Sequence, residues 1–565
     1  MVQAGSVKIE TLRTDVLVLG GGIAGCMAAI KARDAGAEVL VVDKAHLGRS
    51  GSSYQMSGVL TFFDPEEDDY DEWYRECVET SEWLADQDCL RCIIPEIDRV
   101  VLDLESWGVK FQKHLGHFIR KPGVGHVHAR NIVMVQGGFQ LMSILRGEVL
   151  RRGVRTIERV MVTDLLTSER NGRVIGAAGF SYRSGKFFLF EAGVVVLATG
   201  STRAIMNGMR MPSLSGDGNA MAFQVGAQMR SRELAVFYEV PYDFDSIGPG
   251  SNILFGEGAV LVNARGEQFM KSYDPEQKDR VSRSRRFQII AAEESAGKGP
   301  IYLDATGLGD EAHNRIEKAL PIHTMCFEAA GLNLRKDLIR WTYTLTDHSP
   351  GGIRTDHQGR TSVPGLYAAG DTCEHPSSGA CNIITHGMVS AIEGSIAGSA
   401  AAARVEGMEH EPVGRNRVNA IIARTLAPMN RVKGVTHRKI RADGMAVWNL
   451  LGPLKNAARL QAAIDEVRRI RAEELPRIYA PDLHELTRCL GVANELQLLE
   501  LYAVCALART ESRGAHFREE YPQRDDSNWL KWVIAGKRGA DVEIWTEPVP
   551  FDRYALRPGS PNSAS

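Results

Sequence analysis

The sequence predicts an α/β fold in which a parallel sheet domain is interrupted by an inserted α+β domain and followed by a helical domain. An apolar run at residues 15–19, a glycine-rich turn, a helical stretch and a second apolar run, AEVLVVDK, follow within about 30 residues, the length of one βαβ unit. Two further apolar runs that end in glycine turns, at 193–201 and 365–372, lie far apart in the chain. Beyond residue 415, apolar residues recur at helical spacing.

The separation of these runs sets the expected domain boundaries. A sheet assembled from distant segments requires that another domain be inserted between them. We expect residues 1–215 and 351–405 to form the two parts of the sheet domain, with residues 216–350 as an inserted capping domain. Residues 415–510 are expected to be helical, and residues 511–565, rich in Pro, Asp, Arg and Trp, to form an extended tail.

The composition excludes several classes of protein. In 565 residues, Lys+Arg 67 against Asp+Glu 70 leaves a net charge of -3, so we expect no nucleic acid or anionic membrane partner. No apolar run reaches the ~20 residues of a membrane span, and the N-terminus lacks an apolar signal region, so we expect a cytoplasmic protein.

Cysteine usage points to a reducing compartment. The nine Cys are scattered, which is not the pattern of a disulfide framework. Cys89 and Cys92 form the only C-x-x-C pair, within a predicted helix, and are expected to be structural. Because no C-x-x-C-x-x-C run occurs, we expect no iron–sulfur cluster or other metal site in this chain.

The first glycine turn carries the motif Gly20-x-Gly22-x-x-Gly25, and Asp43 ends the following apolar run. The first glycine permits the tight turn, the second lets the backbone approach a pyrophosphate, and the third lets helix and strand pack closely. The helix N-terminus favours the phosphate charge, and Asp43 is spaced to bond ribose hydroxyls. The segment therefore predicts a Rossmann-like dinucleotide-binding unit.

Two distant segments favour FAD over NAD as the dinucleotide. Ala198-Thr199-Gly200 and Gly370-Asp371 each follow an apolar strand, and the Asp can reach the ribityl or pyrophosphate part of an extended cofactor. A third glycine cluster, at 377–387, opens a helix. Its N-terminal amides suit the pyrimidine edge of an isoalloxazine, which becomes anionic on reduction. Ordinary helix capping is the alternative reading of that cluster.

These motifs together resemble the flavoprotein subunits of succinate dehydrogenase and fumarate reductase. The resemblance rests on GGGIAG and DKAHLGRSG near the N-terminus, the segment 215–227, GGIRT at 351–355, GLYAAGD and the C-terminal SRGAHFREEYPQRDD. It covers nearly the whole chain. It implies an FAD-binding domain, an inserted capping domain and a C-terminal helical domain.

Within that superfamily, the sequence is similar to the α subunit of adenylylsulfate reductase. Arg49-Ser50-Gly51 resembles that branch, whereas the covalent-flavin branch carries His where Gly51 stands, so the resemblance implies noncovalently bound FAD. The segments 243–250, 297–301 and 375–379 also resemble it. The residues expected at the cofactor are Gly20, Gly22, Ala24, Gly25, Asp43, Lys44, Arg49, Ser50, Gly51, Ala198, Thr199, Gly200, Asp217, Gly370, Asp371, Ser378, Ala380, Asn382 and Ile383.

The sequence departs from the family at the substrate. Dicarboxylate enzymes carry an Arg that grips a carboxylate where this chain has Asn382, and a His-Pro where it has Val240-Pro241. A charge-assisted pair contributes about 1.5–3 kcal/mol, so its loss argues against succinate and fumarate. Against adenylylsulfate, the Asn expected near Thr61 and the Glu expected near Gly138 are both missing. The resemblance therefore implies a relative with another substrate.

A short basic stretch of the capping domain supplies candidates for proton transfer and substrate binding. Counted back from Gly297, Arg283 matches the proton-transferring Arg of the dicarboxylate enzymes, and Arg286 matches an active-site Arg of adenylylsulfate reductase. Spaced i and i+3 on a helix, both can face one cleft, although a solvated basic surface is the alternative.

Further candidates lie on either side of the inserted domain. His348 precedes a Gly-Gly turn expected near the flavin and is read either as an acid or oxyanion donor or as a buried structural His. Thr61, Tyr238 and Glu239 are weaker candidates for the substrate cavity, as are His126 and His128.

Three hypotheses for function remain open. The first is an FAD-dependent oxidoreductase that acts on a small anionic substrate and exchanges electrons with a separate ferredoxin-like iron–sulfur subunit, as the resemblance implies. The second is a self-sufficient dehydrogenase or oxidase that uses oxygen or a diffusible acceptor. The third is a flavin-binding scaffold without catalysis. An oligomer is compatible with all three.

Overall fold

The computed structural model describes residues 7–121, 128–202, 213–242, 244, 251–346, 351–377, 383–405, 408, 410–539 and 541–559. Its main sheet has seven strands in the order β7-β2-β1-β10-β9-β8, with β17 paired to β10. The strands are β1 (Ile9–Leu19), β2 (Val39–Asp43), β7 (Arg155–Glu158), β8 (Val160–Thr167), β9 (Val174–Ser181), β10 (Phe187–Leu197) and β17 (Leu366–Ala368). Because β17 comes more than 150 residues after β10, the sheet is assembled from distant segments, as the sequence predicts.

Strands β2, β1, β10 and β17 run parallel, so their carboxyl ends meet at one edge of the sheet. Alternate residues of β1 enter different cores: Val16 and Val18 lie in one, Leu17 and Leu19 in the other. Burial on both faces explains the continuous apolar runs seen in the sequence.

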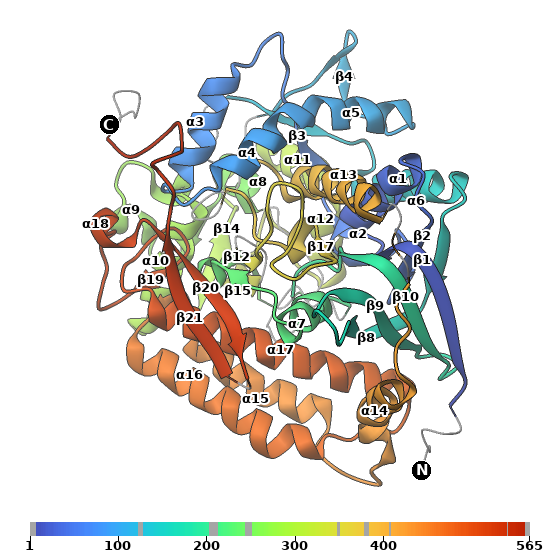
Figure 1. The fold of residues 1–565 in the computed structure, drawn as a ribbon. Helices are drawn as coiled ribbons and strands as arrows, with labels where there is room; N and C mark the ends of the chain where they lie inside the picture. Colours follow the sequence, from blue (N-terminus) through green and yellow to red (C-terminus); the bar gives the residue numbers. More distant parts are fainter. Residues whose placement is uncertain are drawn as a thin grey trace.

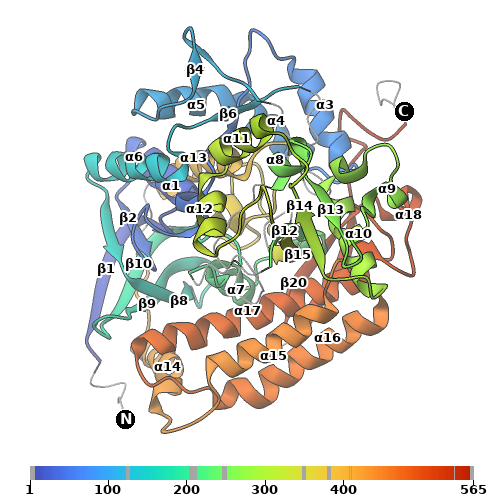
Figure 2. The same ribbon diagram turned by 180° about the vertical axis from the view of Figure 1, so that it is seen from behind.

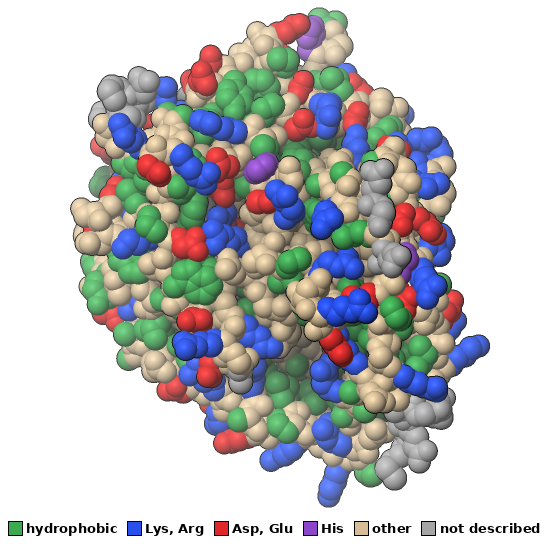
Figure 3. Space-filling model, viewed as in Figure 1, with side chains coloured by type: hydrophobic (Ala, Val, Ile, Leu, Met, Phe, Trp, Pro, Cys, Tyr) green, Lys and Arg blue, Asp and Glu red, His purple; other side chains and the backbone are tan. Residues whose placement is uncertain are grey.

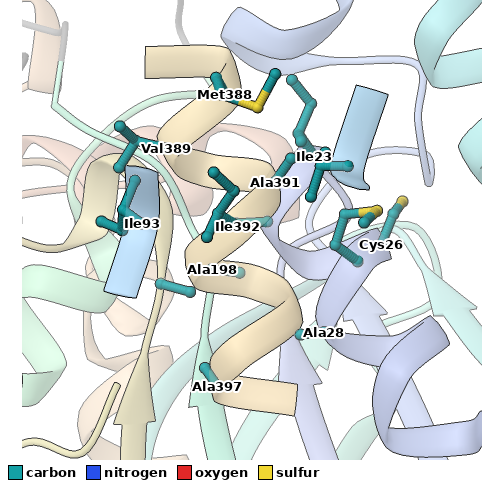
Figure 4. Close-up of a cluster of buried hydrophobic side chains, with 14 of the residues drawn as sticks. Ile23, Cys26, Ala28, Ile93, Ala198, Met388, Val389, Ala391, Ile392 and Ala397 are labelled. Atoms are coloured by element: carbon teal, nitrogen blue, oxygen red, sulfur yellow. The ribbon is translucent and has the colours of Figure 1, made fainter. Parts of the chain in front are cut away.

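Three helices cover one face of this sheet (Figure 1): α1 (Ile23–Asp34), α13 (His386–Val405) and α6 (Gly137–Arg151). Small residues let α1 and α13 approach closely. A Cβ on Gly394 would lie 2.3 Å from the carbonyl oxygen of Ala24, and one on Gly398 would lie 2.3 Å from that of Ala28. Figure 4 shows Ala391 of α13 beside Ile23 of α1. This close packing places the start of α13 near the glycine turn that follows β1.

A layer of helices covers the outer side of this assembly: α3 (Tyr70–Thr80), α4 (Gln87–Ile93) and α5 (Ile97–Ser106). The short strands β3 (Val59–Thr61) and β6 (Asn131–Val133) pair beneath them. Cys89 and Cys92 lie on α4 as free thiols. Burial raises the pKa of the Cys89 thiol well above its usual value, which agrees with a structural role.

The inserted region has its own antiparallel sheet, in the order β12-β15-β14-β13. Its strands are β12 (Val236–Pro241), β13 (Val260–Val262), β14 (Ile301–Asp304) and β15 (Ile339–Thr346). Helix α10 (Arg283–Ser295) packs against β12 through Phe287 and Phe237, whose ring centroids are 5.1 Å apart. A separate apolar core lies within this region.

Four C-terminal helices pack at the end of the molecule opposite α3 and α5 (Figures 1 and 2). They are α14 (Arg415–Leu426), α15 (His437–Leu450), α16 (Ala457–Arg469) and α17 (Leu483–Ala508). By length and hydropathy α17 meets the requirements of a membrane span, but 72% of its apolar window is buried inside the protein. It packs against α15 and α16 and also contacts α7 (Asp217–Gln224), which links the helical domain to the rest of the molecule.

The segment after α17 contains regular structure within the expected tail. Strands β20 (Lys531–Arg538) and β21 (Asp541–Pro548) form a hairpin, and β20 joins β11 (Met229–Arg230), which in turn pairs with β16 (Gly352–Ile353). Within the hairpin, Val533 and Ala535 are fully buried. The β20–β21 hairpin thus joins a strand of the inserted region, β11, and through it β16 of the sheet domain.

Charged side chains of both signs intermingle over the face of the molecule seen in Figure 3. This mixture agrees with the net charge of -3. On this face, no single-sign field of the kind used to attract a nucleic acid stands out.

Candidate functional site

A cleft of about 910 Å³ lies at the edge of the sheet where the carboxyl ends of β1, β2, β10 and β17 meet. In open α/β sheets, ligands bind outside the carboxyl ends of the strands. Among the residues that line the cleft are Gly20, Asp43, Ala198 and Asp371, one from each of the four strand ends.

The glycines of the first turn are required by close backbone approaches. Gly20 has φ +109°, and a Cβ there would lie 2.2 Å from the carbonyl oxygen of Ala198. A Cβ on Gly25 would lie 1.9 Å from the carbonyl oxygen of Gly20. Gly22 has more room, because the nearest atom is the Ser53 hydroxyl at 3.1 Å. Backbone rather than side chains therefore shapes the floor of the cleft, as a pyrophosphate requires.

Asp43 lies at the end of β2 and fixes the loops on both sides of it. Its carboxylate accepts hydrogen bonds from the backbone N–H groups of Gly21 and Ala45, both at 2.6 Å. Burial raises the pKa of this carboxyl, while the two backbone donors oppose the shift. Each oxygen keeps a second lone pair, so the group can also accept a bond from a ribose hydroxyl.

Lys44 and Asp217 lie together at the side of the cleft. Lys44 Nζ is 2.6 Å from Asp217 Oδ2 and 2.8 Å from the hydroxyl of Ser215. Asn494 of α17 donates to the other oxygen of Asp217 at 2.9 Å. These bonds connect the sheet domain to the C-terminal helices, a contact that the sequence does not reveal because its partners lie 277 residues apart.

The strand ends of β10 and β17 meet through Thr372, a residue that sequence reasoning missed. Its hydroxyl accepts the backbone N–H of Gly200 at 2.9 Å and lies 3.4 Å from the hydroxyl of Thr199. Next to it, Asp371 pairs with Nδ1 of His386 at 2.9 Å. Two features of the sequence could have identified these residues. Thr372 directly follows the Gly370-Asp371 motif, and His386 is the first residue of α13.

The Arg49-Ser50-Gly51 segment leads into α2 (Gly51–Gln55). Ser50 and Gly51 line the cleft, whereas the side chain of Arg49 is exposed. Gly51 has φ +73°, and the nearest atom to a Cβ there is 3.9 Å away. The position therefore faces open space and has a backbone conformation that favours glycine.

Several predicted residues lie outside the part of the chain that the structure describes: His348, Ser378, Ala380, Asn382 and His126. The side chain of Tyr238 is not described either. Ile383, at the edge of the described residues, is fully buried in the apolar core beside α13 and does not line the cleft.

Thr61 is buried and joined to the start of α13. Its hydroxyl lies 3.2 Å from that of Thr385, and each of the two residues accepts the other's backbone N–H, at 2.8 and 3.1 Å. These bonds position the segment that follows the residues expected at the flavin. The expectation that Thr61 contacts substrate stays a prediction.

Arg286 and Glu239, two of the predicted substrate-side residues, pair with each other. Arg286 Nε is 2.5 Å from Glu239 Oε1, and the two side chains are 2% and 0% exposed. Arg286 also donates to the carbonyl oxygen of Asp279 at 2.6 Å and lies over the ring of Phe255. The pair ties α10 to β12. Arg283, one turn earlier on α10, is half-buried.

Comparison with known proteins places the chain in a family. Residues 15–383 match the family model described as FAD binding domain, and residues 443–562 match the one described as fumarate reductase flavoprotein C-term. One of the subunits of the fumarate reductase (CoM/CoB) of Methanothermobacter marburgensis is 28% identical, and the match covers 94% of this chain and 98% of that protein. L-aspartate oxidase of Streptomyces coelicolor is 29% identical, covering 93% and 91%.

Solved structures agree in fold. The quinol fumarate reductase flavoprotein of E. coli superposes with a TM-score of 0.87 at 22% identity, covering 98% of this chain and 99% of that one. Adenylylsulfate reductase of Archaeoglobus fulgidus superposes with a TM-score of 0.80 at 20% identity, covering 97% of each. With the cleft geometry above, the match of residues 15–383 to the FAD binding domain assigns the cofactor as FAD. The chain belongs to the succinate dehydrogenase/fumarate reductase flavoprotein family and is an FAD-dependent oxidoreductase.

Proposed function

We propose that this chain is the flavoprotein subunit of an enzyme that transfers two electrons between a small anionic substrate and a separate ferredoxin-like iron–sulfur subunit. The observation that carries the proposal is the end-to-end match to a protein named as one subunit of a fumarate reductase, which covers 98% of that protein. The nine scattered cysteines of this chain lack the spacing that holds a cluster, which fits a division of labour in which the cluster lies on a separate subunit.

The residues of the cleft divide the work of holding the cofactor. Bound FAD supplies the two-electron chemistry. The glycine turn at 20–25 and the start of α1 hold the pyrophosphate, and Asp43 orients the ribose. Asp371, kept in place by His386, faces the cleft from the end of β17.

We infer that FAD is held without a covalent bond. Gly51 lines the cleft at the position where the family's covalent branch carries its His, and a glycine offers no nucleophilic side chain. Retention then depends on the backbone approaches of the glycine turn and on the burial of the cofactor between four strand ends.

We propose Arg283 as the residue that guides the anionic substrate or its proton. It stands at the first turn of α10 and is half-buried, three residues before the Arg286 that pairs with Glu239. Three relatives are named for fumarate, succinate or L-aspartate, all small carboxylates. This chain has Asn382 where the dicarboxylate enzymes carry a clamping Arg, so we propose a different small anion.

A bleaching assay tests the substrate proposal. Under anaerobic conditions, a panel of carboxylate and sulfur anions is mixed with the oxidised protein, and flavin absorbance reports reduction. At least one anion is expected to bleach the flavin. Arg283→Met should slow bleaching by about 100-fold, the loss of one charge-assisted contact of about 3 kcal/mol. The matched control, Arg285→Met, removes an exposed Arg of the same helix and should match the unmodified protein. Equal loss in both variants contradicts the role of Arg283.

The electron acceptor distinguishes this proposal from its main rival. L-aspartate oxidase, similar over 93% of this chain, is named as an oxidase, so a self-sufficient oxidase is the second candidate. We expect the photoreduced flavin to reoxidise slowly in air and quickly with a clostridial-type ferredoxin. Rapid reoxidation by oxygen alone, with no electron transfer to ferredoxin, would favour the oxidase.

A further inference from the structure

A second cavity lies beside the FAD cleft, and a carboxyl group stands between the two. Ala368 lines the second cavity, whereas Ala369 and Asp371 line the FAD cleft, so the segment 368–371 separates them. Glu393 of α13 lines the second cavity and accepts the backbone N–H of Gly370 at 2.9 Å. A single side chain therefore contacts both the wall of the cleft and the neighbouring cavity.

The turn that Glu393 holds has little freedom to move. Gly370 has φ +70°, and a Cβ there would lie 2.8 Å from Cβ of Ala24 and 2.9 Å from the hydroxyl of Ser390. The turn is thus fitted between α1 and α13, and Ser390, which lines the FAD cleft, is one helical turn before Glu393. A change at the carboxyl of Glu393 reaches the cleft directly through the backbone at 370–371.

The second cavity gives this carboxyl a route to solvent. Asp356 and His357 lie at its rim, and His357 is exposed. The cavity has room for on the order of one water molecule beside Glu393. Burial raises the pKa of Glu393 to about 8; the hydrogen bond from Gly370 opposes this shift, and the nearby charges of Asp371 and Glu374 add to it.

Other charged and titratable groups surround Glu393. Glu374 forms an ion pair with Arg230 of β11, which also binds Asp86. Asp371 is paired with His386. Burial raises the pKa values of the Cys89 and Cys373 thiols well above their usual range, so both stay neutral.

We propose that Glu393 is a proton-binding positioning residue of the FAD cleft, which holds the turn at 370–371 in its neutral form and weakens FAD binding when it ionises. The carboxyl accepts the Gly370 N–H in both forms, but only the neutral form adds no charge beside the cofactor. The ionised form places a negative charge behind the wall of the cleft, next to Asp371. The inference concerns cofactor binding alone and is independent of the electron acceptor proposed above.

Proton linkage determines whether FAD affinity rises or falls with pH. A negatively charged cofactor raises the affinity of Glu393 for its proton, so raising the pH must weaken FAD binding. If FAD raises the pKa of this group by one unit, from about 8 to about 9, the Kd for FAD increases about fivefold between pH 7 and pH 9.

The test is the pH profile of FAD affinity, measured from the fluorescence of FAD released when the holoprotein is diluted at pH 6.5–9. The unmodified protein should show the rise in Kd. Glu393→Gln, which keeps an acceptor for Gly370 but does not ionise, should change less than twofold over this range. Glu393→Ala should bind FAD more weakly at every pH.

The matched control is Glu294→Gln. Burial also raises the pKa of Glu294, but this residue lies on α10 beside Arg340, away from the cleft. The Kd of the Glu294→Gln variant for FAD should vary with pH as it does in the unmodified protein. A constant Kd in the unmodified protein overturns the proposal without any variant. An unchanged pH slope in Glu393→Gln overturns it as well.

Discussion

The FAD cleft and the neighbouring capping helix use opposite means to fix their geometry. In the cleft, backbone approaches backbone, and the contacts of Gly20 and Gly25 leave no space for a single added carbon. On α10, two long charged side chains, Arg286 and Glu239, neutralise each other out of contact with water. The cleft is thus fixed by shape and the capping helix by charge pairing. Substitutions should therefore affect cofactor content in the first region and stability in the second.

Gly25→Ala should have the largest effect. The added Cβ would lie 1.9 Å from the carbonyl oxygen of Gly20, so the backbone of the cofactor turn must move. We expect FAD binding to weaken by about 100-fold, measured as flavin content after dialysis. Gly147→Ala is the control, because Gly147 lies on α6 outside the cleft and a Cβ there meets no atom within 4 Å, so FAD binding should stay unchanged. Equal losses would show that shape does not govern the cleft.

Arg286→Met should destabilise the protein and leave its flavin content unchanged. The substitution leaves the buried carboxylate of Glu239 without this positive charge. We expect the free energy of unfolding to fall by about 3 kcal/mol. Arg286→Met combined with Glu239→Leu should recover most of that loss in urea unfolding. If Arg286→Met is instead as stable as the unmodified protein but loses turnover, Arg286 acts in the reaction and the comparison fails.

Lys455 differs from Arg286 because it is a buried amine without a carboxylate partner among the described residues. Its side chain lies over the rings of Phe237 and Tyr502, and its Nζ is 3.4 Å from the carbonyl oxygen of Pro453. Burial lowers the pKa of Lys455 to about 7. Between this value and the usual pKa near 10.5, the unfolded chain binds the extra proton, so this group makes stability rise with pH.

Lys455→Met should therefore raise the Tm by several degrees at pH 6, and the gain should shrink as the pH approaches 10. Thermal unfolding of both proteins at four pH values measures the trend. The exposed Lys433→Met serves as control and should leave the Tm unchanged. A gain that is independent of pH would mean that packing, and not the charge of Lys455, sets the difference.

Arg49→Gln should have the smallest effect. The family resemblance places Arg49 at the cofactor, but the structure exposes its side chain while Ser50 and Gly51 line the cleft. We expect a change in the Kd for FAD of less than about threefold, on the scale of an exposed contact. A larger loss would mean that side-chain charge contributes to a cleft otherwise shaped by backbone.

How far the sequence predicts this molecule depends on the distance between interacting residues. The turn at Gly20–Gly25 and the acidic end of β2 are local, so strand, turn and helix signals locate them within one stretch of chain. The bond of Asn494 to Asp217 and that of Glu393 to Gly370 join separate elements, and no spacing rule indicates them. A basic stretch predicts a role for Arg286, but its pairing with Glu239 depends on how α10 packs on β12, which the sequence does not encode locally.

The state of the flavin after acid precipitation tests how the cofactor is held, because FAD is expected to be retained by backbone contacts alone, with Gly51 at the position of the family's covalent link. Purified protein is denatured with acid and centrifuged, and the flavin in each fraction is quantified against the protein. We expect one FAD per chain, with all of it in the supernatant. Flavin retained in the protein pellet, or a protein purified without any flavin, would contradict it.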